Sequence, residues 1–289
     1  MIENYLLEEL VTFAKYGTVA KTAEVLGLTQ PAVTHSMKKL EEQLGVKLFI
    51  RKPNKLYLSE TGKYTAREAK KLLNDNLDFS KKVKQFEKNQ TTLILGVNAP
   101  GPMIVLRSLN DKNIQIEDKL IESNFESLLA EHQFTCLLIN FPIEDRDITS
   151  TYLGTESMSV NLPTECKLNE NSELSFKMLK GKTILSPANI GFWTQIYHDE
   201  IPDSKIIFQD ESTNYSEILQ YSVLPFFTTN LTRLDSQWGN NLPNNRSVRP
   251  LSDKVAHQKF YACYLKQNQT RLMPLIEKLQ DQWGKYDQM

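Results

Sequence analysis

Side chains that can recognise nucleic-acid bases are spaced along residues 30–44. Gln30, Thr34, His35 and Lys38 recur at intervals that place them on one face of a helix. A Gln side chain pairs bidentately with adenine, Thr contacts a base or a thymine methyl, and Lys reaches guanine or a phosphate. This face therefore indicates a base-reading helix, and its simpler alternative is an ordinary solvated helix face.

The opposite side of the same stretch is apolar. Val33, Met37, Leu40 and Leu44 recur at spacings of three and four, which predicts a buried stripe. Thr29 offers an oxygen to the free amides of the first turn, Pro31 suits that turn, and Gly45 ends the helix.

Two more short helices are expected before it, over residues 6–16 and 18–26, with Gly27 ending the second. Two helices joined by a tight turn that contains Gly are typical of a helix-turn-helix. The residues expected to face inward are Leu6, Leu7, Leu10, Phe13 and Ala14 in the first helix, and Ala20, Ala23, Val25 and Leu26 in the second.

A basic hairpin is expected directly after the third helix. Residues 46–51 and 56–59 predict two strands, and residues 52–55 predict the turn between them. Arg51, Lys52 and Lys55 near the tip can grip phosphates or enter a minor groove. The predicted DNA contacts are Gln30, Thr34, His35 and Lys38 to bases, Lys39, Arg51, Lys52 and Lys55 to the backbone, and the neighbouring Thr29 and Pro31.

The first sixty or so residues closely resemble the N-terminal domain of LysR-type transcriptional regulators. The matching positions are Leu10, Phe13, Gly17, Ala20, Ala23, Leu26, Thr29 to Thr34, Leu40, Glu41, Leu44, Gly45, Leu48, Phe49, Arg51, Leu58, Ser59 and Gly62. Thr18, Thr34 and Ser59 stand where the family often has Ser, Ser and Thr, so a hydroxyl replaces a hydroxyl. The resemblance implies a winged helix-turn-helix over residues 1–60 that binds double-stranded DNA at an inverted repeat.

A long helix without Pro is expected over residues 61–90, and we interpret it as the linker between the two domains. Its apolar residues follow alternating steps of three and four, which is a heptad seam, with Leu73 and Leu77 widening it. The alternative is an amphipathic helix packed on its own domain. The resemblance favours a seam that joins two chains, and it implies homotetramers built from such dimers. The predicted seam residues are Ala69, Leu72, Asn76, Phe79, Val83 and Phe86.

Residues 91–289 alternate between predicted strands and helices, the pattern of an α/β domain. We expect lobe I at 91–155 and 256–289, and lobe II at 156–255, with crossovers near 153–156 and 252–257. Expected helices include 123–131, with Ser123 and Glu126 as a capping box, as well as 189–199, 213–221 and 230–238. The pattern resembles the effector-binding domain of the same family, which is similar in fold to periplasmic binding proteins.

Ligands of open α/β sheets bind beyond the carboxyl ends of strands. This rule, together with the resemblance, predicts a small-molecule effector in the cleft between the lobes. Each such position has an alternative role in loop structure or in lobe packing. The loops contain no Arg, so a strongly acidic ligand is not implied. The predicted effector contacts are Asn98, Ala99, Pro100, Gly101, Asn124, Asn140, Pro142, Pro187, Ala188, Asn189, Ile190 and Phe226.

Composition limits the other function classes. The net charge of −1 means that basic charge must be localised rather than spread over the whole surface. No apolar run is long enough for a membrane span and no signal peptide is evident, so we expect a cytoplasmic protein. The four His and three Cys form no catalytic or metal-spacing motif, and no cofactor is implied.

A rival hypothesis is a ligand-binding module, or an α/β enzyme, that carries a DNA-binding head without specific control of DNA. The recognition helix distinguishes the regulator from this rival. It keeps Gln30, Pro31, Thr34 and Lys38, and we expect no acidic residue on its exposed face before Glu41. A degenerate head is expected to lose that face.

Overall fold

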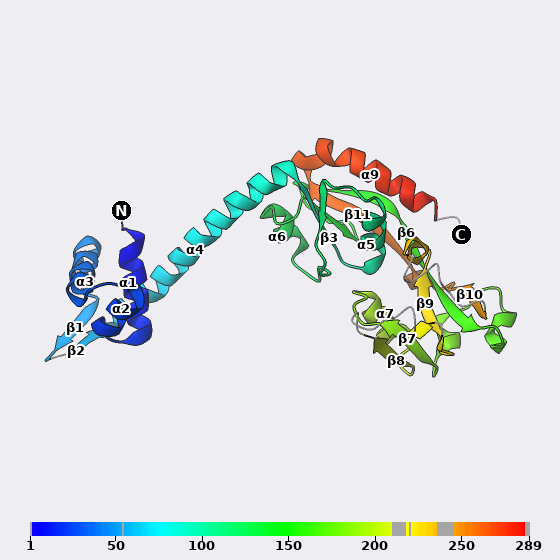
Figure 1. Ribbon diagram of the computed structural model, residues 1–289, viewed down its shortest axis with the longest axis horizontal. Coiled ribbons are helices and arrows are strands. Elements are labelled where there is room, and N and C mark those ends of the chain that lie inside the picture. Colours follow the sequence, from blue (N-terminus) through cyan, green and yellow to red (C-terminus); the bar gives the residue numbers. More distant parts are fainter. Residues whose placement is uncertain (1, 54, 210–217, 220, 236–244, 287–289) are drawn as a thin grey trace. The chain divides into compact units, whose positions relative to one another are not determined.

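The computed structural model describes residues 2–53, 55–209, 218–219, 221–235 and 245–286. The chain divides into two compact units, Met1–Lys84 and Gln85–Met289. The first unit is a winged helix-turn-helix, and a long helix leads into the second unit, which is a two-lobed α/β domain (Figure 1). The predicted fold class is therefore confirmed.

Three short helices form the core of the first unit. They are α1 (Asn4–Tyr16), α2 (Val19–Leu26) and α3 (Gln30–Leu44), and they are followed by the antiparallel hairpin of β1 (Phe49–Lys52) and β2 (Lys55–Leu58). The largest side chains of the predicted inward faces are fully buried, and Phe13 meets Phe49 edge-on with ring centroids 5.3 Å apart. Burial of these apolar side chains fixes the hairpin against the helices.

The buried face of α2 differs from the prediction. Ala20 and Val25 are exposed, as is Ala14 of α1, whereas Thr22 is completely buried. Burial of Thr22 is tolerated because its hydroxyl donates to the Thr18 carbonyl at 2.8 Å. Apolar spacing alone did not reveal that a Thr can bond to its own helix and take a core position.

Near both of its ends, helix α4 (Glu60–Thr91) packs against other parts of the same chain. Ala69 is buried in the core of the first unit, which corrects its assignment to an intermolecular seam, and Leu73 packs against the same core. Near the other end, Phe86 contacts His132 edge-on at 5.2 Å. The seam residues between these ends are exposed, namely Leu72, Asn76, Phe79 and Val83.

The second unit is built on one curled mixed sheet with strand order β4-β3-β5-β11-β6-β9-β7-β8 and with β10 beside β6. The pairs β3–β4, β3–β5, β7–β8 and β7–β9 are parallel, and the pairs made by β6 and β11 are antiparallel. The strands are β3 (Leu93–Val97), β4 (Ile114–Ile116), β5 (Cys136–Ile139), β6 (Ile148–Pro163), β7 (Thr183–Pro187), β8 (Lys205–Gln209), β9 (Phe226–Thr229), β10 (Arg246–Pro250) and β11 (His257–Leu265). The helices are α5 (Pro100–Ser108), α6 (Phe125–Ala130), α7 (Trp193–Glu200) and α9 (Gln269–Gly284).

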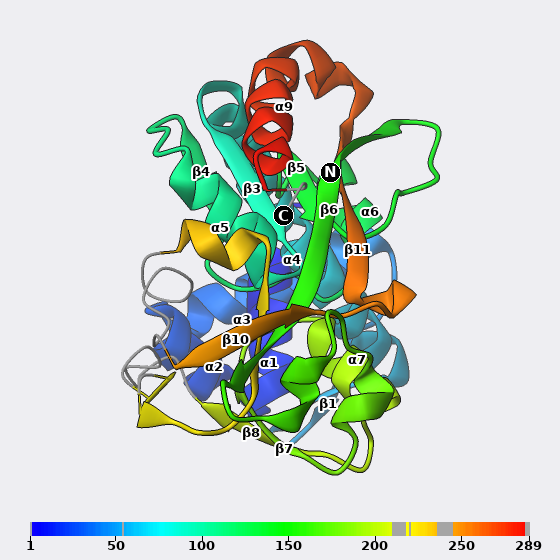
Figure 2. The same cartoon turned by 90° about the vertical axis from the view of Figure 1, so that its right-hand side faces the viewer.

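Strand β6 runs unbroken through both lobes, as Figure 2 shows. The crossover expected near 153–156 is therefore made by continuous strand and not by a break between two strands. The physical reason is β11, which pairs with β6 continuously from Ile148 to Ser157 across one register shift. The chain returns through a 3₁₀ turn at Lys254–Ala256.

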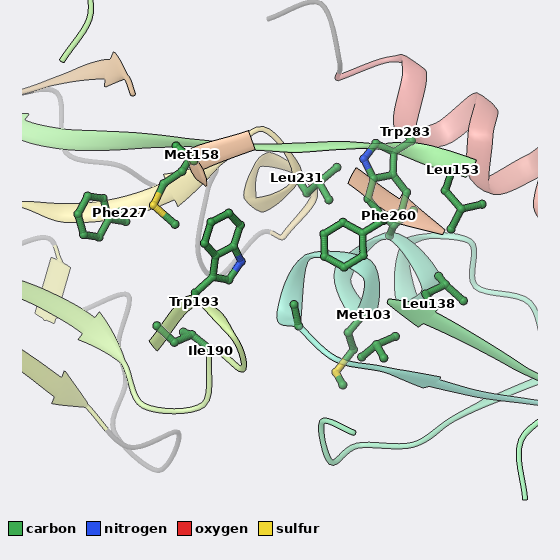
Figure 3. Packing of buried hydrophobic residues seen from close by; sticks show 14 of the residues in the cluster. Met103, Leu138, Leu153, Met158, Ile190, Trp193, Phe227, Leu231, Phe260 and Trp283 are labelled. Carbon is green, nitrogen blue, oxygen red and sulfur yellow. The ribbon is translucent and has the colours of Figure 1, made fainter. Parts of the chain in front are cut away.

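An aromatic row joins the two lobes. The ring centre of Trp193 in α7 lies 4.9 Å from that of Phe192, Phe192 lies 6.0 Å from Phe260 of β11, and Phe260 lies 5.6 Å from Trp283 of α9. Figure 3 shows the buried side chains around this row. Gly154 of β6 leaves room for the Trp283 indole, because a Cβ there would lie 2.3 Å from the ring.

Several helices begin later or are shorter than predicted. Asn124 is left-handed (φ 61°), so α6 starts at Phe125 and the capping box at Ser123 does not form. Gly191 is also left-handed (φ 61°), and α7 starts after it. In the described part of 230–238 only a 3₁₀ turn, Leu231–Leu234, is formed. Most of the helix expected over 213–221 lies outside the described residues.

Candidate functional site

Helix α3 is held in place at both ends. Thr29 caps it, with its hydroxyl oxygen accepting from the Ala32 amide at 3.3 Å, and Pro31 lies in the first turn. At the other end Gly45 is left-handed (φ 68°). Val33, Met37 and Leu40 are buried as predicted, and Leu44 is half-buried. The helix therefore presents a fixed outer face.

Glu41 ties the hairpin to α3. Its carboxylate is 7% exposed and accepts from the amides of Leu48 at 2.7 Å and Phe49 at 3.1 Å. Lys47 Nζ lies 3.8 Å from the other oxygen. Glu41 was expected to be the first acidic residue on the exposed face of the recognition helix, but its side chain points inward to β1 instead. It is a positioning residue that sequence reasoning missed, since its partners lie beyond the end of its own helix.

A groove between α3 and the hairpin collects most of the predicted DNA contacts. Gln30, Thr34 and Lys38 line it from α3, and Arg51, Lys52 and Lys55 line it from β1 and β2. Pro31 and His35 lie beside Arg51 and Lys38 at its outer edge. Thr34 donates its hydroxyl to the Gln30 carbonyl at 2.9 Å, which fixes its rotamer.

The remaining predicted DNA contacts lie outside this groove. Lys39 is bound within the chain, at 2.9 Å from both the Glu3 carboxylate and the Tyr5 hydroxyl. The bond from Lys39 to Glu3, with a further one from Gln43, lowers the pKa of Glu3 to about 2. Thr29 is used as the helix cap.

Other side chains that line the groove were not predicted. Thr18 and Ala20 contribute from the start of α2, and Tyr57 contributes from β2, with its ring 5.7 Å from Lys52 Nζ. Alternation along β2 is the signal that could have identified Tyr57, because Lys55 and Tyr57 project on the same face.

In the α/β domain, amide side chains link loops that are distant in sequence. Asn98 after β3 donates to Asn140 after β5 at 2.7 Å, and Asn140 donates to Gln258 of β11 at 3.2 Å. Gln258 donates to the Val255 carbonyl at 2.8 Å. A carbonyl can only accept, so this last bond orients every amide in the relay. Asn98 Oδ1 is left buried without a partner.

The loop after β7 packs directly on the loop after β3. Gly191 approaches so closely that a Cβ there would lie 2.2 Å from the Asn98 carbonyl oxygen. Ala99, Gly101 and Ile190 are buried at this contact region. The structure thus brings together Asn98–Gly101 and the loop that contains Ile190, two of the segments predicted to contact an effector.

The other predicted effector residues lie in varied surroundings. Pro100, Pro187 and Ala188 are half-buried and Asn189 is exposed. Asn124 and Pro142 are also exposed. Phe226 is fully buried, with the Arg246 guanidinium 4.7 Å from its ring centre.

A buried carboxylate lies beside these loops and was not predicted. Glu156 of β6 is 2% exposed, and its carboxylate lies against the Cα of Gly101 at the start of α5. Burial raises its pKa to about 7, and the nearby Thr229 hydroxyl and Trp193 indole N–H, which favour the charged form, oppose this rise. Glu156 Oε2, Trp193 Nε1 and Thr229 Oγ1 nevertheless form no hydrogen bond of normal geometry.

Comparison with known proteins identifies the first unit. Residues 5–63 match the family model described as bacterial regulatory helix-turn-helix protein, lysR family. The chain is 44% identical over 69 residues to the HTH-type transcriptional regulator CitR of Bacillus subtilis, covering 24% of each chain. It is 29% identical over 186 residues to CfxR of Cupriavidus necator, covering 62% of this chain and 59% of CfxR. The chain thus spans less than two thirds of the length of these relatives.

Solved structures share the fold along the whole chain. Vibrio fischeri DarR, crystallised in complex with DNA, has a TM-score of 0.62 at 17% identity and covers 100% of this chain and 99% of its own. Full-length OxyR C199D from Pseudomonas aeruginosa has a TM-score of 0.52 at 18% identity and covers 100% and 97%. These structural matches show a shared fold, and the family model over residues 5–63 confirms the resemblance of the first unit to LysR-type regulators. No helix in the described ranges is long and apolar enough to cross a membrane.

Replacing Glu41 by Ala should lower the free energy of unfolding of the first unit by about 2–4 kcal/mol, because two buried amides lose their acceptor. Hydrogen exchange of the Leu48 and Phe49 amides should accelerate. The matched control is Glu42→Ala on the exposed face, with an expected change within about 0.5 kcal/mol. Equal, small effects of both changes would show that Glu41 does not hold the hairpin.

The α/β domain should lose stability as pH rises toward neutrality. The pKa of Glu156 is raised in the folded state from 4.5 to about 7, so its contribution is complete below pH 4.5 and is lost as pH rises through 7. Relative to Glu156→Gln, the wild type should lose up to about 3 kcal/mol across this range.

Tryptophan fluorescence during urea unfolding measures the free energy of unfolding of the α/β domain at each pH, because Trp193, Trp238 and Trp283 all belong to the second unit. A difference between the two proteins that does not change with pH would contradict the prediction.

Proposed function

We propose that this LysR-type chain is a DNA-binding transcriptional regulator. Its head would read an inverted-repeat operator, and its α/β domain would bind a small-molecule effector. The observation that carries the proposal is the groove between α3 and the hairpin. Gln30 and Thr34 offer base-reading groups there, and the basic groups of Lys38, Arg51 and Lys52 surround them.

The charge distribution supports this function. The chain as a whole has a net charge of −1, so a non-specific electrostatic attraction to DNA is not expected from its entire surface. Basic side chains are gathered along the groove. The Glu41 carboxylate at its base accepts hydrogen bonds from backbone amides and lies close to Lys47, so its charge is already paired. A localised basic groove that also contains Gln and Thr suits binding of one DNA site in a defined register.

Two copies are required to read an inverted repeat, and α4 offers the surface for pairing. Leu72 is 54% exposed, Phe79 66% and Val83 54%. They follow one another at heptad spacing, with Asn76 among them. We propose that this row joins two chains and that two such dimers form a tetramer. DarR, a protein of the same fold, was crystallised in complex with DNA, which is consistent with a DNA partner for this chain.

The test of the proposal is footprinting of the purified protein on its own genome at physiological salt, where non-specific binding is weak. Sharp sites that contain an interrupted inverted repeat are expected. Diffuse or absent protection, given by a protein that is folded and dimeric, would overturn the proposal.

Replacing Gln30 by Ala should reduce the preference for operator over scrambled DNA by about 1–3 kcal/mol, because a bidentate contact to a base is lost. The ratio of the two dissociation constants measures this preference. Gln43→Ala is the matched control, since Gln43 is exposed on α3 but bonds to Glu3 outside the groove. An unchanged ratio in the Gln30 variant would remove Gln30 from the set of base contacts.

Replacing Phe79 by Lys should weaken the dimer roughly hundredfold or more, because each copy loses about 1.5–3 kcal/mol of apolar burial in a symmetric contact. Sedimentation equilibrium measures the dissociation constant. Lys70→Ala, an exposed position on the same helix outside the predicted seam, should leave that constant unchanged. If the Phe79 variant kept the wild-type constant, the seam would lie elsewhere.

A further inference from the structure

The hydroxyl of Thr34 is turned toward its own helix. It donates a hydrogen bond to the Gln30 carbonyl, one turn earlier, at 2.9 Å. Because its proton is engaged in this way, the hydroxyl cannot also donate to N7 or O6, the two acceptors that guanine shows in the major groove. Turning the hydroxyl toward a base would break the bond to Gln30. What Thr34 offers to a base must therefore come mainly from the rest of its side chain.

The methyl group is the part of Thr34 that is left to face outward. A Thr side chain carries a hydroxyl and a methyl on Cβ, and the two groups lie on different sides of that atom. Since the hydroxyl bonds to the backbone of the preceding turn, Cγ2 is left to project from the helix surface. Thr34 is exposed, and it lines both the groove and the outer edge of the groove. The methyl therefore lies on the surface that faces DNA in the proposed function.

Pro31 adds a second apolar group beside this methyl. It lies three residues before Thr34, and residues at that spacing are neighbours on a helix surface. Pro31 is exposed and lines the outer edge of the groove together with Thr34. Its ring carries no hydrogen-bonding group, and its nitrogen has no N–H. The two side chains thus form a small apolar patch on the outer face of α3.

Polar side chains surround this patch. Gln30, Thr34 and Lys38 follow one another at intervals of four residues, so the methyl lies between an amide and an ammonium group along one row. His35 and Arg51 line the same outer edge. Such a surface suits a base that carries an apolar group next to hydrogen-bonding groups. Among the four bases, only thymine shows such a group in the major groove, namely its C5-methyl beside the O4 acceptor.

We propose that Thr34 recognises thymine through its methyl group, with the Pro31 ring beside the contact, and that its hydroxyl holds the methyl in place. The inference deepens the base-reading role given under Proposed function and rests on it. Each half-site of the operator then contains a thymine whose methyl packs on Thr34. Cytosine lacks this methyl group, and the two purines show only polar groups at their major-groove edge.

Deoxyuridine tests the contact, because it pairs with adenine as thymidine does and lacks only the methyl group. Footprinting first defines the operator. Each thymine is then replaced in turn, at the same position of both half-sites, and the dissociation constant of the full-length protein is measured at physiological salt. One such pair of replacements should weaken wild-type binding about tenfold, which is the product of a roughly three- to fourfold loss for each of two methyl contacts.

Two variants of Thr34 separate the methyl from the hydroxyl. Thr34→Ser keeps the hydroxyl and removes the methyl, so it should bind the thymine operator and the uracil operator within about twofold of each other, because the two deletions remove the same contact. Thr34→Val keeps the methyl and the shape of the side chain and removes the hydroxyl. It should keep most of the preference for thymine.

Thr65→Ser is the matched control. Thr65 of α4 makes the same kind of bond, donating its hydroxyl to the Thr61 carbonyl at 2.8 Å, but it is not among the residues that line the groove. The loss of a methyl at this position should leave the preference for thymine over uracil as it is in the wild type.

The outcomes separate the two levels of inference. Full preference for thymine in Thr34→Ser, loss of the preference in Thr34→Val, or a wild type that binds every uracil operator as tightly as the thymine operator would each overturn the methyl contact. All three are measured on an operator that the protein binds, so they leave the regulator function standing. Footprints without any sharp site would overturn the regulator function and this inference with it.

Discussion

A carboxylate removed from water needs hydrogen-bond donors to replace those it loses, and Glu41 obtains them from the amides of Leu48 and Phe49. This link fixes the hairpin against α3. Together with the apolar packing of Phe49 on Phe13, it sets the shape of the groove, because one wall of the groove is helix and the other is hairpin. A charge inside the head thereby defines the geometry of its outer surface.

Glu156 faces the same requirement in the α/β domain and is left incompletely satisfied. Its neighbours Trp193 and Thr229 do not complete normal hydrogen bonds, and burial raises its pKa to about 7. The two carboxylates differ in their donors. Backbone amides satisfy Glu41, whereas Glu156 has the side chains of Trp193 and Thr229 beside it.

The architecture of the α/β domain places Glu156 between the two lobes. Strand β6 passes through both lobes, so Glu156 lies at their junction rather than within either lobe. Loops after β3 and β7 pack closely there because Gly191 carries no side chain, and Gly101 leaves room for the Glu156 carboxylate. The aromatic row from Trp193 to Trp283 then spans the junction on its apolar side.

The sequence by itself determined the elements whose signals are local. Helix α3, its cap Thr29, its stop at Gly45 and the basic turn were all predictable, because caps, turns and apolar periodicity depend on neighbours along the chain. Tertiary structure alone decided the inward direction of Glu41, the diversion of Lys39 to Glu3, the burial of Ala69 and the continuity of β6. It also placed Glu156 beside Gly101 and oriented Asn98 through Asn140 and Gln258. These features depend on partners far away in sequence, and a pattern of residue types carries no record of which distant group will satisfy a buried polar atom.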